Sequence, residues 1–306
     1  MHITEIKNGV AVEIENFDIR NIDENSAKQI YSTLTNNIIV VLKHQPKDPG
    51  HFTNFVLHLG EIANFKQFYW HPINGKMLYD PSQDKEIIDP KTWPDPSTYP
   101  VQRVTGKKVD GEISGIFGTG MLDWHANLNG LDRADGVALQ GYKDCEGTST
   151  TWLNTAKVYD EMPKDLISRC KNIYCEYTYA PEIWASGLPE KQKAWMLKNA
   201  NTYKMWLLQK NVANKKGLYF YTNNRCKIIS PDAKLYGDLY DFMFQDKFMY
   251  QHNYEVGDIV LSDQILSLHK RDQNDPNILA KRILHRITFK ISNYGTPTWL
   301  EKNNKL

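Results

Sequence analysis

The chain alternates between short apolar runs and polar breaks along most of its length. Residues 10–14 (Val-Ala-Val-Glu-Ile) show the alternation of a β-strand. Residues 38–42 (Ile-Ile-Val-Val-Leu) form a continuous, largely β-branched run, which predicts a buried strand. Similar runs predict further strands at residues 135–142, 149–153, 218–221, 254–261 and 287–292.

Helical patterns are inserted between these strands. Asp23 and the three residues after it form a capping signal for a helix over about residues 25–36. Pro163 separates two other helical patterns, because proline cannot continue a helix through its interior. Further helices are expected at residues 51–59, 155–162, 165–172 and 235–250, and over part of 190–212.

Many short strands with inserted helices favour a mainly β protein with helical insertions, an α+β arrangement around one all-β core. The chain has no Gly-x-Gly-x-x-Gly and no Walker loop, which argues against the nucleotide-binding α/β folds. We expect a single domain over residues 1–306. Long irregular stretches at about 66–120 and 176–215 are typical of binding loops.

Composition indicates an ordinary globular protein. Of the 306 residues, 41% are hydrophobic and 24% charged, and the net charge is only +1. Acidic and basic residues are interleaved, so we expect neither a nucleic-acid partner nor a membrane surface as partner.

The four cysteines and the N-terminus bear on the compartment. No Cys-x-x-Cys pair is present, and four thiols are too few for a disulfide scaffold in a chain of this length. Residues 1–7 lack the basic and apolar regions of a signal peptide, and no apolar run is long enough to span a membrane. We therefore expect a cytoplasmic protein with free thiols.

Two distant segments carry the candidate chemistry. The first, residues 122–127, contains His125 and Asn127 one residue apart, a spacing that lets both side chains face one pocket from a strand. The second, residues 257–286, contains His269 and a later Arg282. Two imidazoles and one oxygen ligand on one side of a metal leave open positions, as ferrous oxygenases require.

In order and spacing these segments resemble the iron(II)/2-oxoglutarate-dependent dioxygenases of the taurine dioxygenase type, the clavaminate-synthase-like group. The resemblance runs nearly from end to end of the chain and implies a double-stranded β-helix, or jelly-roll, core. The matching segments are residues 38–45, 55–62, 122–127, 147–159, 217–220 and 250–271.

The resemblance implies a role for each motif residue. His125 and His269 would ligate Fe(II), and Thr150 and Arg282 would hold the cosubstrate 2-oxoglutarate. A guanidinium suits the far carboxylate of 2-oxoglutarate because it binds carboxylates through two parallel hydrogen bonds. Arg286 could reach the same pocket or an anionic substrate. O2 would be the oxidant, and the resemblance leaves a homo-oligomer open.

Asn127 departs from the family, which has Asp or Glu at this position. An amide oxygen can ligate a metal but neutralises none of its charge. Asn127 could ligate in a working but altered site, leave its position to water, halide or another anion, or mark a site that binds without turnover. A fourth reading is an engineered substitution or another acid, for which Asp123 is the candidate.

Two other polar residues are weaker candidates. Asp263, six residues before His269, could support the ligands through hydrogen bonds, although strand-end packing explains it equally well. His71 falls in the long loop region that shapes the substrate pocket in the family, so it is a candidate substrate contact.

The implied activity is hydroxylation of an unactivated C–H bond in a small, anionic molecule, with 2-oxoglutarate converted to succinate and CO2. The substrate is not readable from the sequence. The alternatives are a non-catalytic or halide-binding member of the same fold and, last, a zinc hydrolase, since no further ligand at helical zinc spacing precedes His269.

Overall fold

The computed structural model describes residues 1–63, 70–71, 73, 75–76, 79–80, 85–86, 101–118, 120–127, 134–178, 190, 194, 198, 202–220 and 226–294. Among these residues, no helix is both long enough and apolar enough to cross a membrane.

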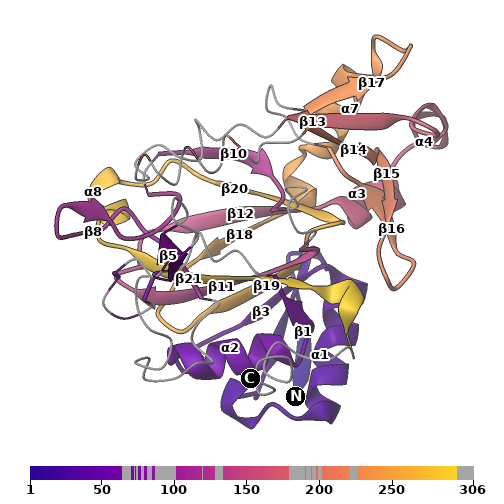
Figure 1. Cartoon of the computed structure of the whole chain (residues 1–306). Helices are drawn as coiled ribbons and strands as arrows, with labels where there is room; N and C mark the ends of the chain where they lie inside the picture. The colour runs from indigo at the N-terminus through magenta and orange to yellow at the C-terminus, as the bar shows by residue number, and fades with distance from the viewer. Residues whose placement is uncertain are drawn as a thin grey trace.

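Two sheets stacked face to face form the centre of the molecule (Figure 1), and their strand pairs are antiparallel except for one parallel pair in the larger sheet. The larger sheet has the order β1 (His2–Ile6), β2 (Ala11–Glu15), β3 (Ile39–Leu42), β19 (Ile259–Asp263), β11 (Gly136–Lys143), β21 (Ile283–Lys290) and β4 (Glu61–Ile62), with β7 (Gln102–Val104) also paired to β21. The smaller sheet has the order β10 (Leu122–His125), β20 (Ser267–Arg271), β12 (Ser149–Asn154) and β18 (Met249–Asn253). The expected mainly β fold with a jelly-roll core is confirmed.

The continuous apolar run at 38–42 is explained by burial on both faces of the larger sheet. Ile39 and Val41 of β3 face the core between the two sheets, where they join Trp152 of the smaller sheet. Val40 and Leu42 point to the opposite side, into a second core beneath the helices. A strand that is apolar on both faces must be covered on both, and this one is.

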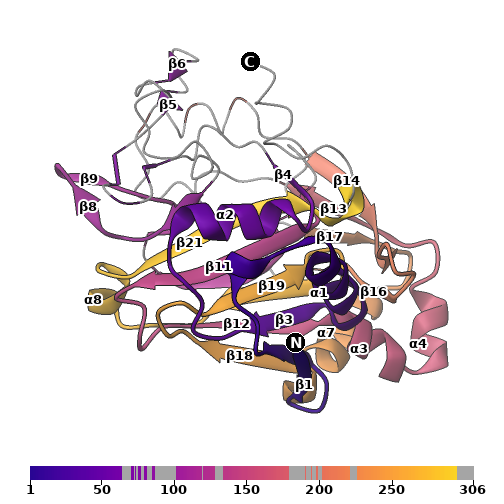
Figure 2. The same ribbon diagram turned by 90° about the horizontal axis from the view of Figure 1, so that it is seen from below.

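Helices cover the outer face of the larger sheet. α1 (Glu24–Asn37) and α2 (Pro49–Leu57) lie across it (Figure 2) and bury Leu34 and Phe52 against it. The predicted start of α1 is correct: the Asp23 side chain accepts from the Ser26 backbone N–H, and Ser26 Oγ accepts from the Asp23 N–H.

A second group of elements packs on the outer side of the smaller sheet. It comprises α3 (Thr155–Glu161), α4 (Lys164–Arg169), α7 (Leu235–Met243) and a three-stranded sheet in the order β14 (Thr202–Trp206), β13 (Tyr174–Thr178) and β17 (Cys226–Ile229). The remaining short elements are β5 (Tyr79–Asp80), β6 (Lys85–Glu86), β8 (Lys108–Val109), β9 (Glu112–Ile113), β15 (Leu208–Lys210), β16 (Lys216–Leu218), α8 (Pro276–Leu279), η1 (Ile19–Asn21), η5 (Asp246–Phe248) and η6 (Ile291–Asn293).

The helix expected over part of 190–212 does not include residues 202–210. These residues form strands, because β14 pairs along its whole length with β13. Tertiary pairing overrides the weak helical preference of this Lys- and aromatic-rich stretch. The helix expected at 235–250 ends at Met243, and Met249 already begins β18. Conversely, the last strand starts earlier than predicted, at Ile283.

A tight junction ties the turn before β19 to the end of β3. Gly257 has φ of +93°, and a Cβ there would lie 2.4 Å from the carbonyl oxygen of Gln45. The Gln45 backbone N–H donates to the Gly257 carbonyl, while its side-chain Oε1 accepts from the Ile19 N–H and its Nε2 donates to the Phe17 carbonyl. Gln45 thus joins three segments at the end of β3.

Replacing Gly257 by Ala should destabilise the fold by about 2 kcal/mol or more, because the left-handed φ disfavours a Cβ and the Gln45 carbonyl blocks it. Gly237 in α7 is the matched control, since a Cβ added there would have no atom within 4 Å. Gly237→Ala should stabilise by up to about 1 kcal/mol, because Ala is the better helix former. Urea unfolding of both variants measures the contrast, and equal effects would contradict it.

Candidate active site

A pocket lies between the two sheets and draws its walls from both. The smaller sheet contributes residues of β10, β20 and β12, and the larger sheet contributes residues of β7, β11 and β21. Its cavity volume is about 40 Å³. The lining residues are Val104, Phe117, Leu122, His125, Asn127, Leu139, Thr150, His269, Arg271, Arg282, Leu284 and Arg286. Six of the nine residues singled out from the sequence are among them.

His125 and His269 come together because β10 and β20 are paired. Their Cα atoms are partners in the antiparallel register, and their ring centroids lie 4.3 Å apart. The Nδ1 atom of His125 lies 2.6 Å from the carbonyl oxygen of Asp123, so Nδ1 carries the proton and Nε2 keeps its lone pair. His269 is flanked on its other side by the Trp152 ring, at a centroid distance of 6.2 Å.

A register shift in β10 decides which side chains of the first motif enter the pocket. The pairing with β20 is irregular between Leu122 and His125, so strict alternation fails there. Leu122 lines the pocket, whereas Asp123 is exposed and offers only its backbone carbonyl to His125. The reading of Asp123 as a substitute acid is therefore wrong in this structure.

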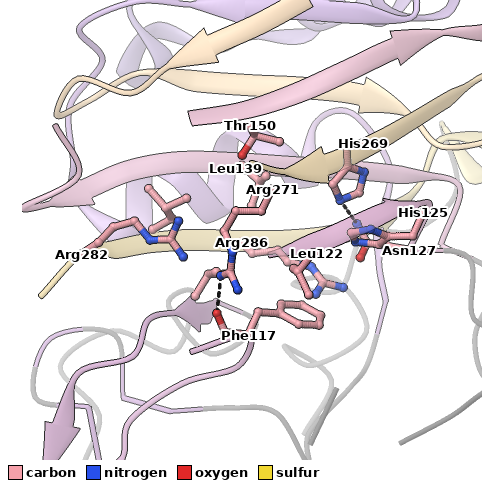
Figure 3. Close-up of a pocket in the computed structure, with 12 residues that line it drawn as sticks. Phe117, Leu122, His125, Asn127, Leu139, Thr150, His269, Arg271, Arg282 and Arg286 are labelled. Carbon is pink, nitrogen blue, oxygen red and sulfur yellow. Dashed lines mark hydrogen bonds between the residues drawn. The ribbon is translucent and has the colours of Figure 1, made fainter. Parts of the chain in front are cut away.

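Asn127 follows β10 and is almost completely buried beside both histidines. Its Nδ2 lies 3.3 Å from His269 Nε2 and 3.3 Å from Gln264 Oε1 (the first contact is dashed in Figure 3). Its backbone N–H donates to the same Gln264 oxygen over 2.8 Å. Figure 3 shows the two histidines and Asn127 gathered at one end of the pocket.

Both imidazoles are held neutral, which a metal ligand requires. Burial lowers the pKa of His125 from 6.5 to about 4, and the nearby Arg286 and Arg271 act in the same direction. Burial also lowers the pKa of His269 well below its usual value, with further contributions from His125 and Arg286. A lone pair is therefore available on each ring at neutral pH.

The opposite end of the pocket is cationic. Arg282 lies at the far end from the histidines, with Arg286 between (Figure 3). Arg282 is 1% exposed, and its Nε and Nη2 atoms have no hydrogen-bond partner among the described residues. Burial lowers its pKa to about 10, so it stays protonated at neutral pH. A buried guanidinium with open donors, in a pocket that Thr150 also lines, fits the carboxylate of a bound dianion.

Arg271 also lines the pocket, and sequence reasoning missed it. It lies two residues after His269 on β20, and the period of two on a strand could have pointed to it. Its Nε donates to the Gly120 carbonyl and its Nη1 to the Phe117 carbonyl, over 2.7 and 2.5 Å. Arg271 thereby holds residues 117 and 120 at the pocket, where the Phe117 ring lies 5.3 Å from the Arg286 guanidinium.

The two other sequence candidates lie outside this lining. Asp263 is buried behind the site, where it accepts hydrogen bonds from Asn211 Nδ2 and the Ile265 N–H, and burial raises its pKa to about 7. His71 sits in a turn closed by the bond from the Gly75 N–H to its carbonyl, and its Nδ1 accepts from the Ile73 N–H. The expected loops at 66–120 and 176–215 fall partly outside the described residues.

These residues fit a divalent transition metal in donor type, but the pocket wall around them carries an unusual net positive charge. Two neutral imidazoles and an amide suit such a metal in donor type. Three guanidiniums and no carboxylate are found among the described lining residues, so nothing in the wall compensates a metal's charge. Anions brought from solution must do so.

Comparison with known proteins bears on the family and the fold of the chain. The model of the family described as "Taurine catabolism dioxygenase TauD, TfdA family" matches residues 2–288. A taurine dioxygenase from Burkholderia xenovorans superimposes with a TM-score of 0.65 at 16% identity, covering 94% of this chain and 88% of that one. AAD-2, crystallised with Mn(II) and N-oxalylglycine, gives 0.64 at 15%, covering 94% and 96%. At these identities the likeness shows the fold alone. No curated protein matches the chain.

Acidification should destabilise the metal-free protein through the buried histidines. The folded-state pKa of His125 lies near 4 and the unfolded value near 6.5, so between them only the unfolded chain binds this proton. Stability is complete above pH 6.5 and falls as the pH falls, by roughly 2 kcal/mol at pH 5 from this one group. Urea unfolding at pH 7 and at pH 5 measures this loss of stability. His125→Gln should flatten the dependence, and an unchanged slope would contradict the assignment.

Proposed function

The chain belongs to the taurine catabolism dioxygenase TauD, TfdA family, and we propose that it is an Fe(II)- and 2-oxoglutarate-dependent oxygenase that hydroxylates a small anionic molecule. Its membership makes it a 2-oxoglutarate-dependent dioxygenase with iron and O2 as its further requirements. The substrate, the residues that act and the outcome of the reaction are the proposal.

One observation carries the assignment of the site. Two neutral imidazoles and an amide meet at one end of a pocket whose other end holds a buried guanidinium with open donors. We assign His125, His269 and Asn127 to iron, and Thr150 and Arg282 to 2-oxoglutarate. N-oxalylglycine, the dicarboxylate in the AAD-2 crystal, is a close analogue of 2-oxoglutarate and supports this reading. The bound iron supplies oxygen activation coupled to decarboxylation of 2-oxoglutarate.

The chain's own residues position and shield the reactants. Asp123 fixes the tautomer of His125 through its carbonyl, so that the ring presents Nε2. Arg282 anchors the cosubstrate by one carboxylate and thereby sets the direction of the other. Leu122, Leu139 and Leu284 form apolar walls, which exclude water from the reacting groups.

Charge favours an anionic substrate. Arg286 lies between the metal end and Arg282 and is 7% exposed. With Arg282 assigned to 2-oxoglutarate, Arg286 is the cation placed to receive a carboxylate, sulfonate or phosphate of the substrate. The loops expected at 66–120 and 176–215 would then supply the remaining specificity, with His71 and Asp263 in supporting roles. None of the four cysteines forms a disulfide, which fits the expected cytoplasmic location.

The uncompensated charge also favours a second candidate. A pocket with three guanidiniums and no described acid could bind an organic acid, or a halide at the metal, without hydroxylating a C–H bond. Release of succinate in the presence of substrate separates the two functions, and dependence of the rate on chloride identifies a halide-binding site.

Anaerobic addition of Fe(II) and 2-oxoglutarate to the metal-free protein should produce a visible charge-transfer band. His269→Ala should abolish it, because one imidazole is lost from the chelate. Arg282→Gln should raise the concentration of 2-oxoglutarate needed by roughly 30- to 100-fold, since a charge-assisted pair is replaced by a neutral contact. A band that survives in His269→Ala would show that iron binds elsewhere.

Arg286→Gln should separate substrate from cosubstrate. We expect the KM for an anionic substrate to rise roughly 10- to 100-fold, while the Kd for 2-oxoglutarate changes little. Succinate release across a panel of small carboxylates, sulfonates and phosphates identifies the substrate and gives its KM, and titration of the charge-transfer band gives the Kd for 2-oxoglutarate. If the Kd for 2-oxoglutarate rises instead, Arg286 serves the cosubstrate.

A further inference from the structure

Gln264 lies in a buried polar network directly behind Asn127. It is fully buried, as is Ser262, and Ser267 is 1% exposed. We propose that Gln264 holds the side chain at position 127 as an uncharged amide, so that this site is built for a neutral oxygen ligand and not for a carboxylate. The part of this inference that concerns a metal rests on the proposed function; the part that concerns the network does not.

The orientation of the Gln264 amide is determined at both ends. Its Oε1 receives the Asn127 backbone N–H over 2.8 Å, and a backbone N–H can only donate. Its Nε2 lies 2.7 Å from Ser262 Oγ and 3.4 Å from Ser267 Oγ. The Ser267 hydroxyl already donates to the Asp263 carbonyl over 2.6 Å, so toward Gln264 it can only accept. Gln264 therefore points its oxygen at residue 127.

Because Gln264 Oε1 can only accept, the side chain that it faces must offer a hydrogen-bond donor. The polar atom of the Asn127 side chain that contacts this oxygen, 3.3 Å away, must be a donor, which makes it Nδ2 and turns Oδ1 to the other side. Asn127 Oδ1 accepts no hydrogen bond from any described residue. The same Nδ2 contacts His269 Nε2, a contact that ends when the imidazole lone pair is given to a metal. The Gln264 contact remains and leaves Oδ1 as the atom available to ligate.

A carboxylate at position 127 would meet the wrong partner. One of its oxygens would face Gln264 Oε1, acceptor against acceptor, inside a buried network. Rotating the Gln264 amide would cure this contact but would set its NH2 against the Asn127 backbone N–H, leaving that buried donor unpaired. The guanidiniums of Arg271 and Arg286 act in the opposite direction, because they favour a negative charge in the pocket. The electrostatic effect of these guanidiniums and the hydrogen bonding of Gln264 therefore have to be separated experimentally.

A double-mutant cycle on the metal-free protein separates them. The variants are Asn127→Asp, Gln264→Met and the pair, compared by thermal unfolding at pH 7. Met keeps the length of Gln but removes its acceptor, and the loss of the Asn127 N–H partner is common to both backgrounds. We expect Gln264→Met to lower Tm by at least about 3 °C more with Asn at position 127 than with Asp, because only Asn loses a favourable contact. Equal decreases overturn the inference.

A second exchange covers the case in which the Met variants do not fold. Gln264→Glu retains an acceptor for both nitrogens of Asn127, and the Ser262 hydroxyl can turn to donate to its other oxygen. It should be tolerated beside Asn127 and should lower Tm by several degrees more when combined with Asn127→Asp, where two carboxylates meet. If the decrease in Tm of the double variant equals the sum of the decreases of the two single variants, the inference is overturned. Gln209→Met, a change outside the pocket, controls for the exchange of Gln for Met.

Mn(II) binding to the same proteins connects the network to the proposed function. Loss of the oriented amide in Gln264→Met should weaken Mn(II) binding roughly tenfold or more, whereas Gln209→Met should not change it. If the wild-type chain binds no Mn(II), the proposed function fails while the unfolding cycle still decides on the network. If the wild type binds and Gln264→Met binds equally well, the amide orientation does not serve a metal and the inference is overturned.

Discussion

The antiparallel pairing of β10 with β20 is the interaction on which the site depends. It sets the Cα atoms of His125 and His269 opposite each other, although they lie far apart in the sequence, and it brings Asn127 to the same end of the pocket. β20 is in turn paired with β12, which carries Thr150 and places Trp152 beside His269. The larger sheet supplies the opposite wall and its arginines. Two rigid sheets thus hold groups that short loops could not keep in register.

Charge is the second constraint. Burial keeps both imidazoles neutral while three guanidiniums stay protonated around the same space, so the described walls carry positive charge only. The low dielectric constant of the protein interior makes such charges interact strongly and raises the free energy of any charge that is left unpaired. Binding of a dianion in the pocket would neutralise part of this positive charge and so stabilise the arrangement. The neutral residue at 127 adds to this requirement, because a carboxylate there would have satisfied part of it.

Patterns in the sequence were enough to predict β2, β3, β11, β12, β19 and β21 of the two sheets, the capped helix α1 and, through the resemblance, most of the polar residues that line the pocket. They failed where tertiary contacts decide. β14 is a strand because β13 pairs with it, and the shift in β10 that excludes Asp123 has no local signal. The Gln264–Asn127 contact joins residues 137 positions apart, so its geometry had to come from the fold. Arg271 could have been found from its spacing to His269 alone.

The uncharged donor set has a thermodynamic consequence for an enzyme of this kind. When the protein contributes no negative charge to a divalent ion, most of the neutralisation comes from the dianionic cosubstrate, and the two ligands bind with positive coupling. By linkage the coupling is reciprocal: each raises the affinity for the other by the same factor. Occupancy of the centre then follows the product of the two free concentrations rather than either one. Such a chain would release its metal whenever cosubstrate runs low, and would act as a coincidence detector for iron and 2-oxoglutarate as well as a catalyst.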